Sequence, residues 1–248
     1  MVFFLFGFLG GRISGVRVAK QYLAQLDETK IALQQTEDAL LEAQSVPEEV
    51  PVMREEIVYP WNLMLINAQH PLQDGYVVPE QTILASGHSI DERAYPALQD
   101  MMDGARAAGL EPLICSSFRT EEKQQELFEA KVQYYMDQGQ DRAQAEESAT
   151  YWVQRPGTSE HQMALAVDIV DSSYQLLDEA QEQTPVQIWL MEHCAEYGFI
   201  LRYPTDKSDI TGVGYEPWHY RYVGVEAAQE IMGQGICLEE YLYPDQYE

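Results

Sequence analysis

Basic residues are scarce in this sequence of 248 residues. Lysine and arginine together number 15, against 41 aspartates and glutamates, and the formal net charge at pH 7 is -26. A protein with a field of this sign repels the phosphate backbones of nucleic acids and the surfaces of anionic membranes. The charge balance therefore argues against nucleic-acid binding as the function.

Cysteine is also rare, and its spacing suggests no special chemistry. The three cysteines are Cys115, Cys194 and Cys237, and none belongs to a Cys-x-x-Cys pair. This pattern indicates neither a disulfide framework nor a zinc site built from thiolates. We expect the three side chains to be buried as small apolar groups, which is the common environment of free cysteine.

The sequence has no hydrophobic run long enough to cross a membrane. Residues 2–9 are almost all apolar, but a helix needs about 20 such residues to cross the hydrocarbon core. Positive charges follow this run, at Arg12, Arg17 and Lys20, whereas a secretory signal carries them in front. We interpret residues 1–17 as the remainder of a longer signal-anchor or as a short interfacial anchor, and either would tether the chain to a membrane.

A heptad pattern follows the apolar segment. Leu26, Leu33 and Leu40 recur every seven residues within the range 18–45, which contains neither proline nor glycine. This spacing predicts a helical stalk or a weak coiled coil through which the chain could self-associate. Residues 46–58 combine two prolines with several glutamates, which is typical of an acidic linker. The folded domain is then expected to span residues 59–248.

Helical and strand-like patterns alternate irregularly in this domain. Thr120 and Thr184 stand where helix N-caps are expected, and Gly109 and Gly198 stand where helices end. The pattern predicts an α+β fold, with a small, largely antiparallel sheet flanked by helices and an N-terminal helical stalk. The expected helices are 91–108, 120–138, 141–153, 184–198 and 225–232, and the expected strands are 63–66, 113–119, 164–170, 199–203 and 218–223.

Two short stretches carry the residues of a metal centre. His161 stands seven positions before Asp168, and about fifty residues later Glu216 stands three positions before His219. Two imidazoles and one carboxylate form a three-ligand zinc set that leaves one tetrahedral position open. The remaining glutamate could serve as the general base of a metallohydrolase.

Other hydrolytic chemistries fit the sequence less well. It contains no His-Glu-x-x-His pair, which excludes the zinc proteases that carry both histidines on one helix. No serine stands three residues before a lysine, and this argues against a serine carboxypeptidase of the penicillin-binding type. The stretch 157–161 is close to a nucleophile elbow but has His161 where the second glycine should stand.

The two stretches resemble the motifs of the VanY-type zinc D-alanyl-D-alanine carboxypeptidases, which share a fold with zinc dipeptidases and the Hedgehog signalling domain. The motif Ser-x-His-x-x-Gly-x-Ala-x-Asp matches here except at Ala164, where the family has glycine. If that position requires a positive φ, alanine strains the backbone there. The resemblance covers roughly residues 60–235. The matching residues are Phe118, Arg119, Thr120, Gln124, Ser159, His161, Ala166 and Asp168, and the unbroken run from Glu216 to Arg221.

The resemblance implies a role for each matched residue. It makes His161, Asp168 and His219 the zinc ligands and Glu216 the catalytic base. Arg119 would hold the terminal carboxylate of the substrate or the developing oxyanion. Gln124, Ser159 and Trp218 would contribute to substrate binding around them.

The expected protein is an extracytoplasmic, envelope-associated bacterial zinc carboxypeptidase. Its partners would be peptidoglycan stem peptides, from which it removes the C-terminal D-alanine. Several alternatives stay open at this point. The same fold could carry an L,D-carboxypeptidase, a dipeptidase or an endopeptidase, or it could be a zinc-containing binding module without catalysis.

Overall fold

The computed structural model describes residues 30–36 and 59–247, and the chain divides into a first unit, residues 1–57, and a second unit, residues 58–248. Residues 30–36 are helical, within the predicted stalk. The rest of the stalk, the apolar segment 1–17 and the whole linker 46–58 lie outside the described residues. Within the described ranges, no helix combines the length and the hydropathy needed to cross a membrane.

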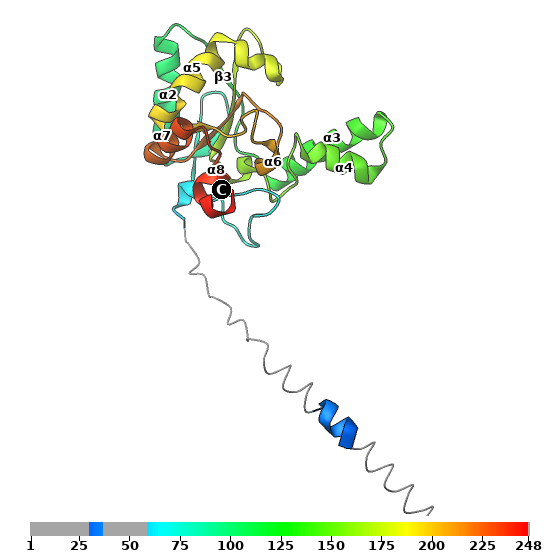
Figure 1. The fold of residues 1–248 in the computed structure, drawn as a ribbon. Coiled ribbons are helices and arrows are strands. Elements are labelled where there is room, and N and C mark those ends of the chain that lie inside the picture. Colours follow the sequence, from blue (N-terminus) through cyan, green and yellow to red (C-terminus); the bar gives the residue numbers. More distant parts are fainter. Residues whose placement is uncertain (1–29, 37–58, 248) are drawn as a thin grey trace, which may run out of the picture. The chain divides into compact units, whose positions relative to one another are not determined.

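The second unit is built on a four-stranded antiparallel sheet (Figure 1). Its spatial order is β3-β4-β6-β5. Every residue of β4 is buried, which explains why its sequence Ala-Val-Asp-Ile-Val-Asp is apolar at most positions. A separate hairpin pairs β1 with β2. The strands are β1 Gln81–Ile83, β2 Ser89–Asp91, β3 Pro112–Ser116, β4 Ala166–Asp171, β5 Phe199–Leu201 and β6 His219–Tyr222.

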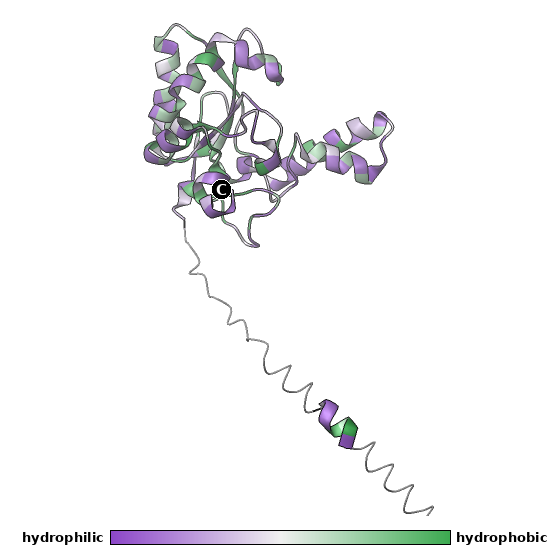
Figure 2. Ribbon diagram, in the orientation of Figure 1, coloured by the Kyte–Doolittle hydropathy of each residue, from purple (hydrophilic) through white to green (hydrophobic). Residues whose placement is uncertain are grey.

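Two helices, α2 (Tyr95–Ala107) and α5 (Pro185–His193), share the main hydrophobic core with the sheet. On α2 the buried residues Leu98, Met101, Met102 and Ala105 recur at the spacing of one helical face. This face packs into the core that contains the apolar residues of β4, and Figure 2 shows hydrophilic colours on much of the helical surface. The α+β prediction is therefore confirmed.

A second core lies at the C-terminal end of the chain. It contains Ile200 of β5, Ala228 and Ile231 of α7, and Leu238 of α8. The helices are α7 Val225–Gln234 and α8 Leu238–Leu242, and the short elements are η1 Trp61–Leu63, η2 Glu160–Met163, η3 Glu179–Gln183, η4 Cys194–Tyr197, α6 Ser208–Thr211 and η5 Pro244–Gln246.

Helices α3 (Glu121–Asp137) and α4 (Arg142–Thr150) form a hairpin that reaches away from the sheet (Figure 1). We call these two helices the arm. Thr120 caps α3, and Asp141 forms a capping box at the start of α4, as polar residues at these positions predict. The arm has a small apolar core of its own, consisting of Phe128, Val132, Ala145 and Ala149.

Some predicted details were wrong. Cys194 and Cys237 are buried, but Cys115 is exposed, because the pairing of β3 with β4 skips this residue at an irregularity between Ile114 and Ser116. The predicted strand 63–66 does not form, because residue 63 ends η1 and residues 64–66 pair with no strand in the described part of the chain. The predicted helix 184–198 is divided into α5 and the 3₁₀ turn η4. Helix α2 starts at Tyr95 rather than at residue 91, because Asp91 belongs to β2.

Candidate functional site

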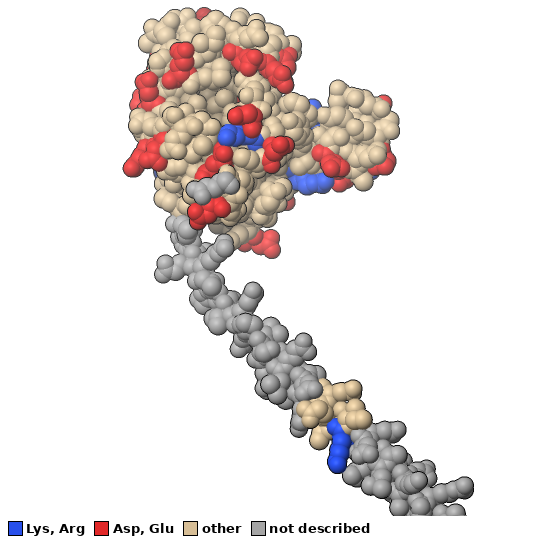
Figure 3. All heavy atoms as spheres, viewed as in Figure 1, with Lys and Arg blue, Asp and Glu red and all other residues tan. Residues whose placement is uncertain are grey.

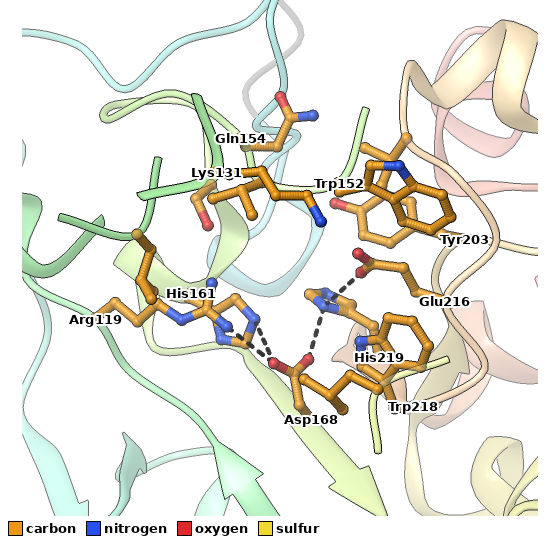
Figure 4. Close-up of a pocket in the computed structure, with 15 residues that line it drawn as sticks. Arg119, Lys131, Trp152, Gln154, His161, Asp168, Tyr203, Glu216, Trp218 and His219 are labelled. Carbon is orange, nitrogen blue, oxygen red and sulfur yellow. Dashed lines mark hydrogen bonds and ion pairs between the residues drawn. The ribbon is translucent and has the colours of Figure 1, made fainter. Parts of the chain in front are cut away.

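Three distant segments bring the predicted ligands together. His161 lies in η2, Asp168 in β4 and His219 at the start of β6. The pairing of β4 with β6 places Asp168 directly opposite His219. His161 Nε2 lies 3.3 Å from Asp168 Oδ2, and His219 Nδ1 lies 3.1 Å from Asp168 Oδ1. One ligand atom from each residue lies within 4.8 Å of the others, and Figure 4 shows all three turned toward one another.

A left-handed turn returns the chain from η2 to the sheet. Ala164 follows η2 with φ 60° and ψ 27°, and among the described residues it is the one non-glycine residue with positive φ. Its carbonyl oxygen accepts a hydrogen bond from the N–H of Asp91. The turn brings His161 back over β4, where it faces Asp168.

The hydrogen bonds of the two histidines leave the correct atoms for a metal. His161 Nδ1 lies 2.7 Å from the carbonyl oxygen of Ser117, so this nitrogen donates its proton there and Nε2 presents a lone pair to Asp168. His219 Nε2 faces Glu160 Oε2 at 3.5 Å, and its Nδ1 faces Asp168 Oδ1. Asp168 Oδ1 has no hydrogen-bond partner among the described residues.

This donor set fits a divalent zinc ion. Two nitrogen lone pairs and a carboxylate, each less than one-twentieth exposed, converge on a single point. Atoms of this kind lie so close together when a proton or a metal cation is shared between them. Two imidazoles and one carboxylate form the ligand set of many catalytic zinc sites.

The site also shifts the pKa values of its histidines. Burial, reinforced by the charge of Arg119, lowers the pKa of His161 to about 4, so this ring is neutral at pH 7. Burial would also lower the pKa of His219, but its contacts with Asp168 and Glu160 outweigh burial and raise that pKa to about 9. A metal ion that binds here must therefore displace a proton from His219.

Glu216 lies beside the ligands in the position of a base. Its Oε2 is 3.6 Å from His219 Nδ1, and the N–H of His219 donates to the carbonyl oxygen of Glu216. A single turn therefore holds both the predicted base and a predicted ligand. Burial raises the pKa of Glu216 to about 8, which places its titration near neutrality, where a general base is most effective.

Arg119 is fixed against the ligand Asp168. Its Nη2 donates to Asp168 Oδ2 at 2.9 Å, its Nε donates to Ser116 Oγ at 3.0 Å, and its Nη1 donates to Gln124 Oε1 at 3.3 Å. Gln124 is fully buried and donates in turn to the carbonyl oxygen of Gln154. The structure thus places Gln124 behind Arg119, where it orients the guanidinium.

The predicted ligands, Glu216 and Arg119 line a cavity of about 230 Å³. Ser159 and Trp218 line it, as do Arg119, Glu216 and the three ligands, whereas Gln124 is not among the lining residues. Sequence reasoning did not assign the rest of the wall to the site, because most of these residues lie in no recognisable motif. The missed lining residues are Leu127, Lys131, Trp152, Val153, Gln154, Leu177, Tyr203 and Val213.

Behind His219 lies a buried ionic network. Glu160 Oε1 accepts from Arg202 Nε at 2.7 Å and from Arg221 Nη1 at 2.8 Å. Arg202 also donates two hydrogen bonds to Glu239, at 2.7 and 2.8 Å. Two guanidinium groups therefore balance two carboxylates without solvent, and the second oxygen of Glu160 is left to face His219. Sequence reasoning missed Glu160 although it stands beside a ligand in the motif.

Comparisons with known proteins identify several relatives of this chain. The family model described as VanY, D-alanyl-D-alanine carboxypeptidase, matches residues 87–225. A D-alanyl-D-alanine carboxypeptidase of Enterococcus faecalis is 51% identical over 183 residues, which cover 73% of this chain and 66% of that protein. The putative carboxypeptidase YodJ of Bacillus subtilis is 36% identical, and the match covers 75% of this chain and 69% of YodJ. The chain thus spans about two thirds of the length of these relatives.

Solved structures resemble the second unit. VanYB in complex with D-alanine-D-alanine is 49% identical, with a TM-score of 0.68, and the match covers 74% of this chain and 98% of VanYB. A VanY D,D-pentapeptidase mutant in complex with Zn(II) gives the same TM-score and identity, with 74% and 99% of the two chains covered. The LdcB LD-carboxypeptidase is 35% identical, with a TM-score of 0.61 and coverage of 74% and 86%.

Proposed function

The chain belongs to the VanY family of D-alanyl-D-alanine carboxypeptidases, and from this premise we propose that it is a zinc enzyme that removes the C-terminal D-alanine from peptidoglycan stem peptides. One observation carries the proposal. His161, Asp168 and His219 converge on a single point, and the carboxylate of Glu216 lies beside them at the wall of the same cavity. A purely structural zinc site would not need that free carboxylate.

Zinc would be held by His161 Nε2, His219 Nδ1 and the carboxylate of Asp168. When bound, such an ion polarises the peptide carbonyl and makes hydroxide available from water near pH 7. Glu216 accepts the proton that the attacking water loses and passes it to the nitrogen of the departing D-alanine. The amide bond breaks, and the upstream peptide keeps the new carboxylate.

The remaining residues hold the substrate in place. The guanidinium of Arg119 lies next to Asp168 and offers its donors where the terminal carboxylate or the developing oxyanion would lie. Gln124 and Ser116 fix the direction of this guanidinium. Ser159 and Trp218 line the cavity, where they would contact the peptide.

The preference for a D,D rather than an L,D bond is part of the proposal. The chain is 49% identical to VanYB, crystallised with D-alanine-D-alanine, but 35% identical to the LdcB LD-carboxypeptidase. A relative from Enterococcus gallinarum is 36% identical and is named as a bifunctional D-Ala-D-Ala dipeptidase and carboxypeptidase. Dipeptidase activity is therefore the second candidate. This substrate class also supports an extracytoplasmic location at the cell envelope, where residues 1–17 would serve as the membrane tether.

The decisive experiment measures release of D-alanine. Zinc-loaded protein would be incubated with a stem pentapeptide that ends in D-Ala-D-Ala, with the tetrapeptide that ends in a single D-alanine, and with the free dipeptide. We expect release from the pentapeptide, its loss on treatment with a chelator and its recovery on addition of zinc. No chelator-sensitive release from any of the three would refute the proposed function.

A further inference from the structure

Lys131 differs from the other cations of the folded unit. In residues 59–247, every other lysine and arginine forms at least one ion pair with a carboxylate, and Lys131 forms none. The chain as a whole has 41 acidic residues, so an unpaired lysine is not explained by a lack of partners. Its ammonium group is therefore a positive charge that the protein itself does not neutralise.

This charge lies at the catalytic cavity. Lys131 is half-buried on helix α3 and lines the cavity together with the ligands and Glu216. Its Nζ lies 5.4 Å from the ring centroid of Tyr134, 5.7 Å from that of Tyr135 and 5.8 Å from that of Trp152. Figure 4 shows the ammonium group turned inward over the cavity. Aromatic rings hold a cation in position, but they carry no net charge to compensate it.

The two cations of the cavity have different surroundings. Arg119 is bonded to Asp168, Ser116 and Gln124, close to the predicted metal ligands, and under the proposed function it holds the terminal carboxylate of the substrate. Lys131 belongs to the arm, and a separate wall of the cavity is formed by Leu127 and Lys131 of the arm together with Trp152, which lies just after α4. A substrate that is anchored by its terminal carboxylate at Arg119 would leave this wall to contact the uncleaved part of the peptide.

We propose that Lys131 forms a subsite for a carboxylate on the uncleaved part of the substrate. The choice of substrate rests on the proposed function. Stem peptides contain a γ-linked D-glutamyl residue upstream of the cleaved bond, and this linkage leaves an α-carboxylate free. Such a group would otherwise be repelled by a protein with a net charge of -26, and Lys131 supplies the local opposite charge. A carboxamide at the same position would gain no such attraction.

The test compares two N-acetylated peptides. One is γ-D-glutamyl-L-lysyl-D-alanyl-D-alanine with its glutamyl α-carboxylate free, and the other has this carboxylate converted to a carboxamide. Titration calorimetry measures their binding to the zinc-loaded full-length Glu216→Gln protein, in which slow turnover keeps both peptides intact. We expect the free carboxylate to be bound about tenfold more tightly, as for one hydrogen bond between charged groups.

Variants of the same protein assign the preference to Lys131. Lys131→Met removes the charge and keeps most of the side-chain stem, so it should weaken only the carboxylate peptide and abolish the preference. Lys131→Arg keeps the positive charge and should keep most of the preference for the carboxylate peptide. Lys123→Met is the matched control, because Lys123 lies on the same helix but is exposed and paired with Glu126, and it should leave both affinities within about twofold.

The outcomes separate this proposal from the proposed function. Equal binding of the two peptides, or a preference that survives Lys131→Met, would overturn the role of Lys131. Equal weakening of both peptides by Lys131→Met would also overturn it, because the lysine would then act on the terminal residue or on Glu216. Release of D-alanine by the wild-type protein is measured separately. A carboxylate preference without any release would refute the peptidase alone.

Discussion

Glu216 and His219 are predicted to perform different tasks although only two residues separate them. His219 presents a nitrogen lone pair to the metal position, whereas the carboxylate of Glu216 stands beside it and lines the cavity. The peptide Glu-Pro-Trp-His makes this division in one turn, closed by a hydrogen bond from the N–H of His219 to the carbonyl oxygen of Glu216. The two functions can therefore be separated by mutation.

Glu216→Gln tests this separation. The amide keeps the size of the side chain but cannot accept a proton, so turnover should fall by at least about 100-fold while zinc is retained. Steady-state release of D-alanine gives kcat, and metal analysis after gel filtration gives the zinc content. Loss of zinc in this variant would instead make Glu216 a ligand and leave the enzyme without its assigned base.

Glu160 acts on zinc only through His219. Its Oε2 faces His219 Nε2 at 3.5 Å, while its other oxygen is held by Arg202 and Arg221. A carboxylate in this position fixes the tautomer and the orientation of a ligating histidine, and loss of such a partner typically costs 10–100-fold in metal affinity.

Glu160→Gln should therefore weaken zinc binding by roughly 10-fold or more. Competition with a chromophoric chelator measures the affinity of the wild type and the variant. The matched control is Glu239→Gln, which disturbs the same Arg202, whereas within the described residues Glu239 forms no ion pair with His219. If both variants lose the same affinity, the effect comes from the ionic network as a whole and not from the orientation of the histidine.

At the scale of elements, the turn at Ala164 connects the first ligand to the second. The sequence predicts backbone strain at Ala164 if this position requires a positive φ. The structure gives φ 60° there, so the strain is present. Alanine in the left-handed region costs about 1–2 kcal/mol. The cost is accepted here within a turn whose carbonyl oxygen bonds to Asp91.

Two substitutions measure that strain. In Ala164→Gly, the relief is opposed by the greater entropy of glycine, about 0.5–1 kcal/mol, and by loss of a buried methyl group, about 0.8 kcal/mol, so the free energy of unfolding should change by less than about 1 kcal/mol. Ala164→Val should destabilise the protein by more than about 2 kcal/mol, because a β-branched residue fits this conformation poorly. Urea unfolding of both variants decides, and a neutral valine variant would contradict the account.

The elements also explain how much of the site the sequence could predict. His161, Asp168, Glu216 and His219 were predictable, because their chemistry and order form two compact motifs. The register that sets Asp168 opposite His219 was not, since it depends on strand pairing across about fifty residues.

The opposite wall of the cavity was also beyond sequence reasoning. Leu127 and Lys131 are ordinary residues of a helix, and only the docking of the arm beside the sheet gives them a place at the cavity. Glu160 illustrates the same limit in another way. Its neighbour His161 marked the motif, but its partner Arg202 directly follows β5 and its partner Arg221 lies in β6, and only the folded chain brings them to it.

For the whole molecule, the excess of acidic residues separates into two populations. Figure 3 shows Asp and Glu spread over the visible face with few Lys and Arg among them. Glu160 and Glu239 belong to the other population, because both are buried and bonded to guanidinium groups. Protonation relieves repulsion at the surface, but in the interior it breaks ionic contacts. The buried carboxylates should therefore control how stability responds to acid.

Glu239 gives this response a definite sign. Burial would raise its pKa, but the charge and hydrogen bonds of Arg202 outweigh burial and hold the pKa of Glu239 below its ordinary value of 4.5. The unfolded chain then binds the proton more readily than the folded chain. The stability from this group is complete above about pH 4.5 and is lost as the pH falls toward the lower pKa of the folded state.

Urea unfolding of the zinc-free protein at pH 7, 5, 4 and 3 should show this loss, with the midpoint falling most below pH 4.5. Glu239→Gln should be less stable at pH 7 by about 3 kcal/mol, because it leaves the charge of Arg202 partly unpaired, and its stability should fall less steeply in acid. Glu126→Gln is the surface control, since Glu126 and its partner Lys123 are both mostly exposed, and it should follow the wild type. A Glu239→Gln protein with the same acid response as the wild type would show that the buried ion pairs do not set the acid limit of the fold.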